Sequence, residues 1–235
     1  MNLKNKKYLF FDLDGTLTPS RQKIKQEMSE ILPKLGRTII VVSGSKNSQI
    51  REQISDLSVY SLGQNGNQAM DTSGNLLWEN ILSVEEKRAV MDHIKLIRPK
   101  LTHAIPNEDD LIEDRGSQVS FSIYGHNAPP EEKRSCDGDF KKRRYLLSQY
   151  PFISDTMEVQ IGGSTCLDYF KKGLNKGTNV KRLIDTMGWN KEECVYFGDA
   201  LFPGGNDETV VGVIDTVEVT NEVDAVNKLR RYFLT

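Results

Sequence analysis

The sequence predicts an α/β protein, with a doubly wound Rossmann-like core and a smaller α+β domain inserted into it. Buried-strand and helical patterns alternate before residue 82 and again after residue 172, which is typical of a parallel sheet covered by helices on both faces. The segment between them groups one-faced strands with helices, as α+β domains do. We therefore predict a core domain of residues 1–81 and 173–235 and an inserted domain of residues 82–172.

In the first core segment, the apolar run "YLFFD" predicts a buried strand that ends at Asp12. Residues at helical spacing predict the next helix, which Gly36 ends: Ile24, Met28, Ile31, Leu32 and Leu35. "RTIIVVSGS" predicts a second buried strand, followed by a helix to about Leu57 and a third strand in "VYSLGQNG". "AMDTSGNLLWEN" predicts a hairpin that turns at Ser73 and Gly74.

In the inserted segment, Ser83 and Glu86 form a capping-box pattern that predicts a helix start, and Pro99 ends this helix. The alternation in "QVSFSIYG" predicts a half-exposed strand, "FKKRRYLLSQY" predicts a helix, and "MEVQIGGSTCLDYF" predicts one or two strands. The core then resumes. A helix ended by Gly188, strands in "ECVYFGDA" and "VIDTVEVT", and a helix from about Asn221 complete it.

Composition argues against several classes of partner. The net charge is −2 with 27% charged residues, so we expect neither a nucleic-acid partner nor an anionic membrane. The basic run at residues 141–144 is interpreted as a solvated helix face. No apolar run approaches the ~18 residues of a membrane span. Cys136, Cys166 and Cys194 form no paired framework, which suits a reducing compartment, and we expect a cytoplasmic protein.

Polar and small residues gather where the predicted core strands end or the next helix begins: Asp12, Asp14, Ser43, Gly44, Lys176, Asp199 and Asp207. Ligands of doubly wound sheets bind at that edge. Carboxylates that bind Mg²⁺, an ammonium group and a hydroxyl suit phosphoryl transfer. If strand geometry continued past Asp12, its carboxylate and that of Asp14 would leave the same face, where a cation would relieve their repulsion. One carboxylate could attack phosphorus and the other could act as general acid and base.

Four motifs, "FDLDGTLT", "VVSGS", "NKG" and "YFGDALFPGGND", resemble in order those of the haloacid dehalogenase superfamily. The inserted segment is similar to the type-IIB cap of that superfamily. "DGTLTPSRQKI", "VQIGGSTCLDYF" and "GDALFPGGNDE" resemble the eukaryotic-type phosphomannomutases along nearly the full chain. The resemblance implies a Mg²⁺-dependent enzyme that acts on a small phosphorylated sugar and closes its cap over the site. Relatives of this kind dimerise through the cap, so a homodimer is a further expectation.

The resemblance also implies roles for the core residues. Asp12 is the expected nucleophile, which forms an aspartyl-phosphate, and Asp14 is the expected general acid and base. Ser43, with Gly44, is expected to hold the transferring phosphoryl group, and Lys176 to fix that group and the nucleophile. The implied metal site consists of Asp12, Asp14 (through its backbone carbonyl), Asp199 and the supporting Asp207.

For substrate binding, Arg21 and Arg115 match arginines that approach the sugar phosphate, and Asp168 matches an acid that binds sugar hydroxyls. Three expected substrate contacts depart from the phosphomannomutase pattern, two replacing arginines and one a serine: His126, Lys133 and Cys166. Because bidentate arginines hold a bisphosphorylated sugar more firmly than lysine or neutral histidine, the altered clamp slightly favours a sugar-phosphate phosphatase. The alternative is a phosphomannomutase or phosphoglucomutase, and a second alternative is a non-catalytic sugar-phosphate-binding protein.

Overall fold

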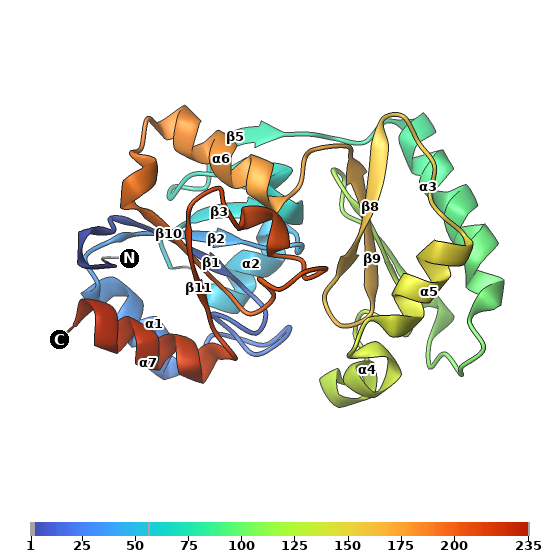
Figure 1. Cartoon of the computed structure of the whole chain (residues 1–235), viewed down its shortest axis with the longest axis horizontal. Coiled ribbons are helices and arrows are strands. Elements are labelled where there is room, and N and C mark those ends of the chain that lie inside the picture. The colour runs from blue at the N-terminus through green and yellow to red at the C-terminus, as the bar shows by residue number, and fades with distance from the viewer. Residues whose placement is uncertain (1–2, 56, 235) are drawn as a thin grey trace. The chain divides into compact units, whose positions relative to one another are not determined.

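The computed structural model describes residues 3–55 and 57–234, and the chain divides into two compact units. The core unit consists of Met1–Glu79 and Leu174–Thr235, and the inserted unit consists of Asn80–Gly173 (Figure 1). The sequence places the corresponding boundaries at residues 82 and 172.

The core unit is built on a seven-stranded sheet of order β11-β10-β1-β2-β3-β4-β5. Its strands are β1 (Tyr8–Asp12), β2 (Thr38–Val42), β3 (Tyr60–Gly63), β4 (Gln68–Met70), β5 (Leu76–Glu79), β10 (Cys194–Gly198) and β11 (Asp215–Glu218). The five strands from β11 to β3 run parallel, and β4 and β5 continue the sheet antiparallel. The predicted hairpin is confirmed, and Gly74 in its turn has a φ of +84°, a conformation that glycine adopts at little cost.

Helices cover both faces of the core sheet. They are α1 (Gln26–Lys34), α2 (Asn47–Ile54), α6 (Lys176–Met187) and α7 (Glu222–Phe233). Because side chains alternate across a strand, Leu9 and Phe11 of β1 pack with α1, α2 and α7, whereas Phe10 packs with α6. Figure 1 shows α1 and α7 side by side, with α6 across the sheet from them. Burial on both faces explains why the central strands are continuous apolar runs in the sequence.

The inserted unit is a four-stranded antiparallel sheet of order β6-β7-β9-β8. Its strands are β6 (Ile112–Asp114), β7 (Val119–Ser122), β8 (Met157–Gly162) and β9 (Cys166–Lys171), and its helices are α3 (Val84–Ile97), α4 (Pro130–Asp137) and α5 (Lys141–Gln149). Apolar residues of α3 and α5 pack against those of β7 and β9, among them Val90, Leu146, Phe121 and Leu167. Ser83 and Glu86 form the predicted capping box at the start of α3.

Short 3-10 helices complete the secondary structure: Leu3–Asn5, Gln64–Gly66, Arg98–Lys100, Glu108–Asp110, Lys191–Glu193 and Glu208–Val210. The predicted fold class, a doubly wound core with an inserted α+β domain, is confirmed by the strand orders of the two sheets.

One prediction for the inserted segment is wrong, and a second holds for Lys141, Lys142 and Arg144 but not for Arg143. The strand β7 is buried along its whole length rather than half-exposed, because Ser120 and Ser122 on its polar side are enclosed and hydrogen-bonded to Asp168 and Thr165. The run at residues 141–144 is not a uniformly solvated face, since Arg143 is completely buried. Two further elements, β6 and α4, were not indicated by the sequence pattern.

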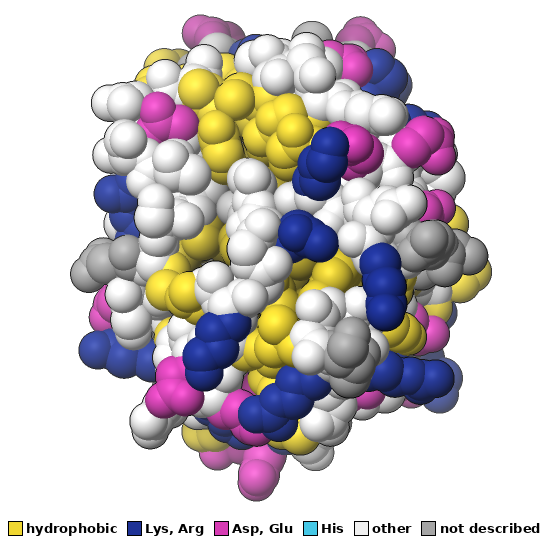
Figure 2. All heavy atoms as spheres, turned by 90° about the vertical axis from the view of Figure 1, so that its left-hand side faces the viewer, with side chains coloured by type: hydrophobic (Ala, Val, Ile, Leu, Met, Phe, Trp, Pro, Cys, Tyr) yellow, Lys and Arg dark blue, Asp and Glu magenta, His cyan; other side chains and the backbone are white. Residues whose placement is uncertain are grey.

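The charged surface is mixed on the face shown in Figure 2, where Lys and Arg side chains are dispersed among uncharged and apolar ones, with acidic side chains beside them. Within the described part of the chain, the helices are too short or too polar to cross a bilayer.

Candidate active site

The strand β1 lies at the switch point of the core sheet, because the chain continues to β2 on one side and to β10 on the other. Ligands of doubly wound sheets bind at such points, beyond the carboxyl ends of the strands. The register pairs Asp12 with Val42, so that Ser43 follows directly beside it. On the other side Phe11 pairs with Phe197, which brings Asp199 to the same edge. The parallel pairing thus brings polar residues that are distant in the sequence to one edge of the sheet.

A buried lysine joins two carboxylates at this edge. Lys176 begins α6, whose N-cap residue is Asn175, and its side chain is almost fully buried. Its Nζ atom donates to Oδ1 of Asp12 at 2.6 Å and to Oδ1 of Asp207 at 2.7 Å. The alternation along β1 explains the first contact, because Asp12 leaves the strand on the same side as Phe10, which packs against α6.

Asp207 is held by a residue that the sequence analysis missed. The hydroxyl of Tyr196, within β10, donates to Oδ1 of Asp207 at 2.6 Å, and the backbone N–H of Ala200 donates to Oδ2 at 3.4 Å. The tyrosine lies in an apolar strand pattern that does not distinguish it from a core aromatic residue. Burial and the neighbouring carboxylate raise the pKa of Tyr196 well above its usual range, so it acts as a hydrogen-bond donor.

Burial is the main cause of the shifted pKa values of Asp12 and Asp199. It raises the pKa of Asp12, an effect that the Lys176 ammonium opposes and that Asp207 and Asp199 reinforce. Burial, followed by the charge of Asp207, raises the pKa of Asp199 to about 6. The lysine has the reverse pattern, because the two carboxylates outweigh its burial and raise its pKa. One ammonium among three acids leaves negative charge that a cation would stabilise.

The donor set fits a hard divalent cation. Carboxylate oxygens of Asp12, Asp199 and Asp207 lie within 4.8 Å of one another, and magnesium prefers oxygen ligands. The space beside Asp199 is kept open by Gly15, where a Cβ atom would lie 2.5 Å from Oδ2 of Asp199. Gly15 also has a φ of +87°, which favours glycine.

Asp14 lies beyond the end of β1, so the strand geometry that would place it on the same face as Asp12 does not continue. Its Oδ1 atom accepts hydrogen bonds from the backbone N–H of Arg21 at 2.6 Å and from Nε2 of Gln53 at 3.1 Å. Arg21 has a φ of +54°, an uncommon conformation for a residue with a side chain. The structure therefore brings Arg21 to Asp14 through its backbone, and the contact expected from its guanidinium group stays a prediction.

Ser43 is buried, and its Oγ atom accepts from the backbone N–H of Ser45 at 3.1 Å. Gly44 lies between these two residues in the loop after β2. This loop is further held by the backbone N–H of Asn65, which donates to the carbonyl of Ser43 at 2.8 Å. The arrangement fixes the predicted phosphoryl-holding loop at the same strand edge as Asp12.

A second cluster lies within the inserted unit. Arg115 is buried and donates from Nε and Nη2 to Oε2 of Glu113, at 2.9 and 2.6 Å. Glu113 is also 3.8 Å from Nδ1 of the buried His126. That same nitrogen lies 3.7 Å from Sγ of Cys166, and Asp168 accepts from Ser120 Oγ at 2.6 Å. Four of the predicted substrate residues thus lie in one unit, two on β9 and two in the loops after β6 and β7. Glu113 is a further partner that the sequence did not indicate.

Lys133 belongs to the same unit, but its side chain bonds to the backbone of the protein. Its buried ammonium group donates to the backbone carbonyl of His126. The side chain therefore supports the loop after β7, and its predicted contact with a substrate phosphate stays a prediction.

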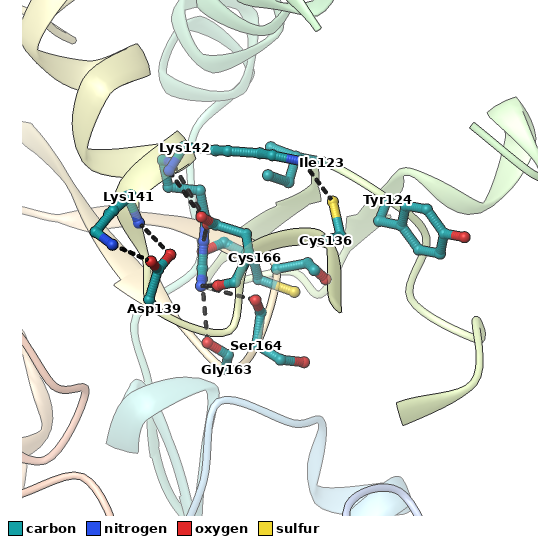
Figure 3. Close-up of polar contacts among 12 residues, drawn as sticks. Ile123, Tyr124, Cys136, Asp139, Lys141, Lys142, Gly163, Ser164 and Cys166 are labelled. Carbon is teal, nitrogen blue, oxygen red and sulfur yellow. Dashed lines mark hydrogen bonds and ion pairs between the residues drawn. The ribbon is translucent and has the colours of Figure 1, made fainter. Parts of the chain in front are cut away.

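Arg143 fixes the turn between β8 and β9. Its Nε donates to Oδ2 of the buried Asp137 at 2.6 Å. Its Nη atoms donate to four carbonyls of the turn: Gly162 (2.7 Å), Gly163 (3.1 Å), Ser164 (2.8 Å) and Cys166 (2.9 Å). Figure 3 shows Gly163, Ser164 and Cys166 around these bonds, and shows Lys141 turned to Asp139 and Lys142 turned to Cys136. Local sequence gave no signal that one of four basic residues would be enclosed.

The predicted residues therefore form two groups, one in each unit. The core group contains the Asp12, Lys176, Asp199 and Asp207 cluster, with Asp14 and Ser43 on the adjoining loops, and the inserted group surrounds Cys166. Carboxylates, a buried ammonium group and a hydroxyl at one strand edge can perform nucleophilic attack and acid–base chemistry at a phosphorus centre.

The comparisons point to one family. The sequence model of the haloacid dehalogenase-like hydrolases matches residues 9–135 and 130–207. The chain is 28% identical to a phosphomannomutase of Schizosaccharomyces pombe, with 97% of this chain and 95% of the relative covered. It is 26% identical to phosphomannomutase 1 of Homo sapiens, with 98% and 93% covered.

Solved structures share the fold at lower identity. SMU.1108c of Streptococcus mutans UA159 superposes with a TM-score of 0.70 at 17% identity, covering 98% of this chain and 100% of that one. BT1666 of Bacteroides thetaiotaomicron, from a study of phosphatases of the haloalkanoate superfamily, superposes with a TM-score of 0.65 at 14% identity, covering 98% and 96%. These likenesses support the fold.

Proposed function

Because the chain belongs to the haloacid dehalogenase-like hydrolase family, we propose that it transfers the phosphoryl group of a small phosphorylated sugar to Asp12 and from there to water. The observation that carries this proposal is the pairing of Asp12 with Lys176 at 2.6 Å, at the switch point of the core sheet. The lysine favours the ionised form of this buried carboxylate, the form that acts as a nucleophile, and so opposes the effect of burial. The curated relatives are phosphomannomutases, which supports a sugar phosphate as the substrate class.

The chemistry follows from the positions of Asp12 and Asp14. An Asp12 oxygen forms a bond to phosphorus while the bond from phosphorus to the sugar oxygen breaks. Asp14, oriented by Gln53 and the backbone of Arg21, gives its proton to that departing oxygen. Asp14 then takes a proton from water as the water attacks phosphorus, and the bond to Asp12 breaks. Lys176 and Ser43 hold the phosphoryl oxygens during both steps.

A magnesium ion fits the core cluster. Asp12 and Asp199 would hold it, together with the backbone carbonyl of Asp14, while Asp207 supports the site through its bonds to Lys176 and Tyr196. When bound, the ion supplies positive charge that neutralises the phosphate oxygens.

We favour phosphatase activity over mutase activity because of the inserted unit. The three residues that depart from the phosphomannomutase pattern, His126, Cys166 and Lys133, have partners within the protein. His126 lies beside Cys166 and Glu113, and Lys133 donates to a backbone carbonyl. Fewer bidentate donors would hold a bisphosphorylated sugar less firmly. A phosphomannomutase or phosphoglucomutase is the second candidate, supported by nearly full-length relatives of that name and by Arg21, Arg115 and Asp168. A non-catalytic sugar-phosphate binder is the third, and the intact pair of Asp12 and Asp14 argues against it.

The cytoplasmic location and a homodimer through the inserted unit stay predictions, as do the assignments of catalysis to the core unit and of sugar selection to the inserted unit. Size-exclusion chromatography with light scattering would test the dimer directly.

The test incubates the protein with mannose 1-phosphate and Mg²⁺, with and without a hexose bisphosphate, and follows both free phosphate and mannose 6-phosphate. We expect phosphate release that does not need the bisphosphate and that Asp12→Asn abolishes. Activator-dependent mannose 6-phosphate would instead support the mutase. Binding of the sugar phosphate without either product would support the non-catalytic alternative.

A further inference from the structure

Cys166 and His126 form a polar pair that the proposed phosphoryl chemistry does not use. Cys166 begins β9, and His126 lies in the loop after β7. The Sγ atom of Cys166 is 3.7 Å from Nδ1 of His126, a distance at which a sulfur atom can share a proton with nitrogen. The histidine is completely buried, whereas Cys166 is partly exposed. An enclosed base thus faces the thiol of a partly exposed residue.

The protonation pattern of His126 follows from its other ring nitrogen. Nε2 lies 3.2 Å from the backbone carbonyl of Ser120, and a carbonyl only accepts hydrogen bonds. Nε2 therefore carries a proton, and Nδ1 of the neutral ring offers its lone pair to the thiol. Transfer of the thiol proton to Nδ1 gives a thiolate beside an imidazolium ion.

The groups around this pair come from several elements. Glu113 of β6 lies 3.8 Å from Nδ1 and stabilises the imidazolium. The positive charge of Arg115, after β6, favours the thiolate but disfavours the imidazolium, whereas Asp168 of β9 opposes the thiolate. Arg143 of α5 donates to the backbone carbonyl of Cys166 at 2.9 Å and keeps the residue in place. The net effect of the surroundings raises the pKa of His126 and lowers that of Cys166, and both changes favour the ion pair.

The ionisation of the cysteines agrees with this geometry. Burial opposes ionisation of the Cys166 thiol, but the His126 imidazole outweighs it and, with Arg115, lowers the pKa of Cys166 to about 7. Burial raises the pKa of Cys136, in the same unit, and it raises that of Cys194 to about 12. The other two cysteines therefore serve as internal references.

We propose that Cys166 is a nucleophilic thiolate, activated by His126, and a site of covalent modification by small hydroperoxides. The sulfur attacks one peroxide oxygen, so that an S–O bond forms as the O–O bond breaks. Sulfur is oxidised by two electrons to a sulfenic acid and the peroxide is reduced. The departing oxygen leaves as water or an alcohol after it takes the proton from the His126 imidazolium. This chemistry needs no substrate turnover and does not depend on the proposed function.

The first test measures the alkylation rate of each cysteine in the folded protein. Limiting iodoacetamide is added over a range of pH, and the peptides carrying the three cysteines are quantified by mass spectrometry. We expect the rate at Cys166 to rise through a midpoint near its pKa of about 7, well below the midpoint at Cys136. Equal rates at Cys166 and Cys136 near neutral pH would overturn the proposal. This comparison uses the unaltered protein, so it does not depend on the folding of a variant.

A pair of variants tests the role of the imidazole. With His126→Asn, the thiolate fraction at neutral pH falls from about one half to that of an ordinary cysteine, so Cys166 should react about 15-fold more slowly or worse. The matched control is His103→Asn, which removes a different histidine, one that lies 3.6 Å from Cys136, and should leave Cys166 unchanged. An unchanged Cys166 rate in folded His126→Asn would overturn the proposal.

The hydroperoxide itself is tested with hydrogen peroxide followed by dimedone, which traps sulfenic acids. The dimedone adduct should form at Cys166 before it forms at Cys136, and His126→Asn should slow it. Absence of the adduct at Cys166, with alkylation as expected, would overturn the assignment of hydroperoxide as the modifying agent.

Discussion

Replacing Lys176 with methionine removes the ammonium group that joins Asp12 and Asp207, with both contacts below 3 Å. All three side chains are at most about 5% exposed, so water cannot take over the role of the lysine. Methionine keeps much of the length and the apolar stem of lysine, so the substitution changes charge more than volume. The variant therefore isolates the electrostatic contribution of the buried ammonium group.

The expected loss of unfolding free energy is about 3–5 kcal/mol at neutral pH without Mg²⁺, the typical cost of removing one partner from a buried ion pair. A single pair of charges about 4 Å apart attracts by about 4 kcal/mol at an effective dielectric constant near 20, and here there are two pairs. The burial of the lysine offsets part of that attraction.

The loss should shrink at lower pH. Burial already raises the pKa of Asp12 and Lys176 opposes that rise, so its removal raises the pKa of Asp12 further. A carboxyl group with a raised folded-state pKa makes the folded state less stable as pH rises through that range. Protonation at mildly acidic pH therefore restores part of the stability of the variant.

The assay is urea unfolding in EDTA at neutral and mildly acidic pH. Lys181→Met is the matched control, because Lys181 lies on the same helix and pairs with Asp185 at 2.5 Å while both side chains are more than half exposed. Such a pair contributes only about 0.2–0.5 kcal/mol. Equal losses for Lys176→Met and Lys181→Met at neutral pH would refute the reasoning.

Four further predictions concern Asp199, its metal site, Arg143 and Tyr196. In EDTA, Asp199→Asn should melt higher than the unaltered protein above about pH 6, since burial and Asp207 raise the pKa of Asp199 to about 6 and ionisation then costs stability. Mg²⁺ should raise the melting temperature of the unaltered protein, and this increase should shrink as pH falls below about 6. Mg²⁺ should not raise the melting temperature of Asp199→Asn. Equal increases for the two proteins would contradict the metal site. Arg143→Met should lose about 3–5 kcal/mol in urea unfolding because it leaves Asp137 buried and unpaired, whereas the exposed Arg144→Met should lose less than about 1 kcal/mol. Tyr196→Phe should lose about 1–3 kcal/mol in the same assay, because Asp207 loses a buried donor, and an unchanged midpoint would show that this bond is not needed.

The residues that the sequence assigned to the core site lie together in the structure because they are tied to strand ends. Asp12, Ser43 and Asp199 each follow a continuous apolar run, and parallel pairing brings the carboxyl ends of such runs together. Lys176 was likewise marked by its place at the start of a helix. These sequence signals are local, and the doubly wound topology places the residues that carry them at one edge of the sheet.

The missed features depend on contacts between distant positions. Tyr196 differs from a core aromatic residue only because Asp207 lies beside its hydroxyl. Arg143 is enclosed, unlike its basic neighbours, because the turn carbonyls about 20 residues later face it. A buried guanidinium group needs such partners, and the sequence alone does not show where they are.

The inserted unit shows the same limit. Cys166 and His126 are 40 residues apart in the chain, and only the pairing of β7 with β9 brings their elements together. The sequence marked both positions as departures from a known pattern, but the proton-sharing pair became visible only in the structure.

Trapping the covalent intermediate tests the central claim, that Asp12 is the nucleophile, most directly. Asp14→Asn is incubated with p-nitrophenyl phosphate and Mg²⁺, because this leaving group needs little acid assistance while the attack of water lacks its base. Borohydride then reduces an aspartyl-phosphate to homoserine, which mass spectrometry locates in the peptide. We predict homoserine at position 12, dependent on substrate and absent when Asp12 is also replaced by asparagine. Homoserine at another acidic position, or its absence at position 12 while p-nitrophenol is released, would contradict the account.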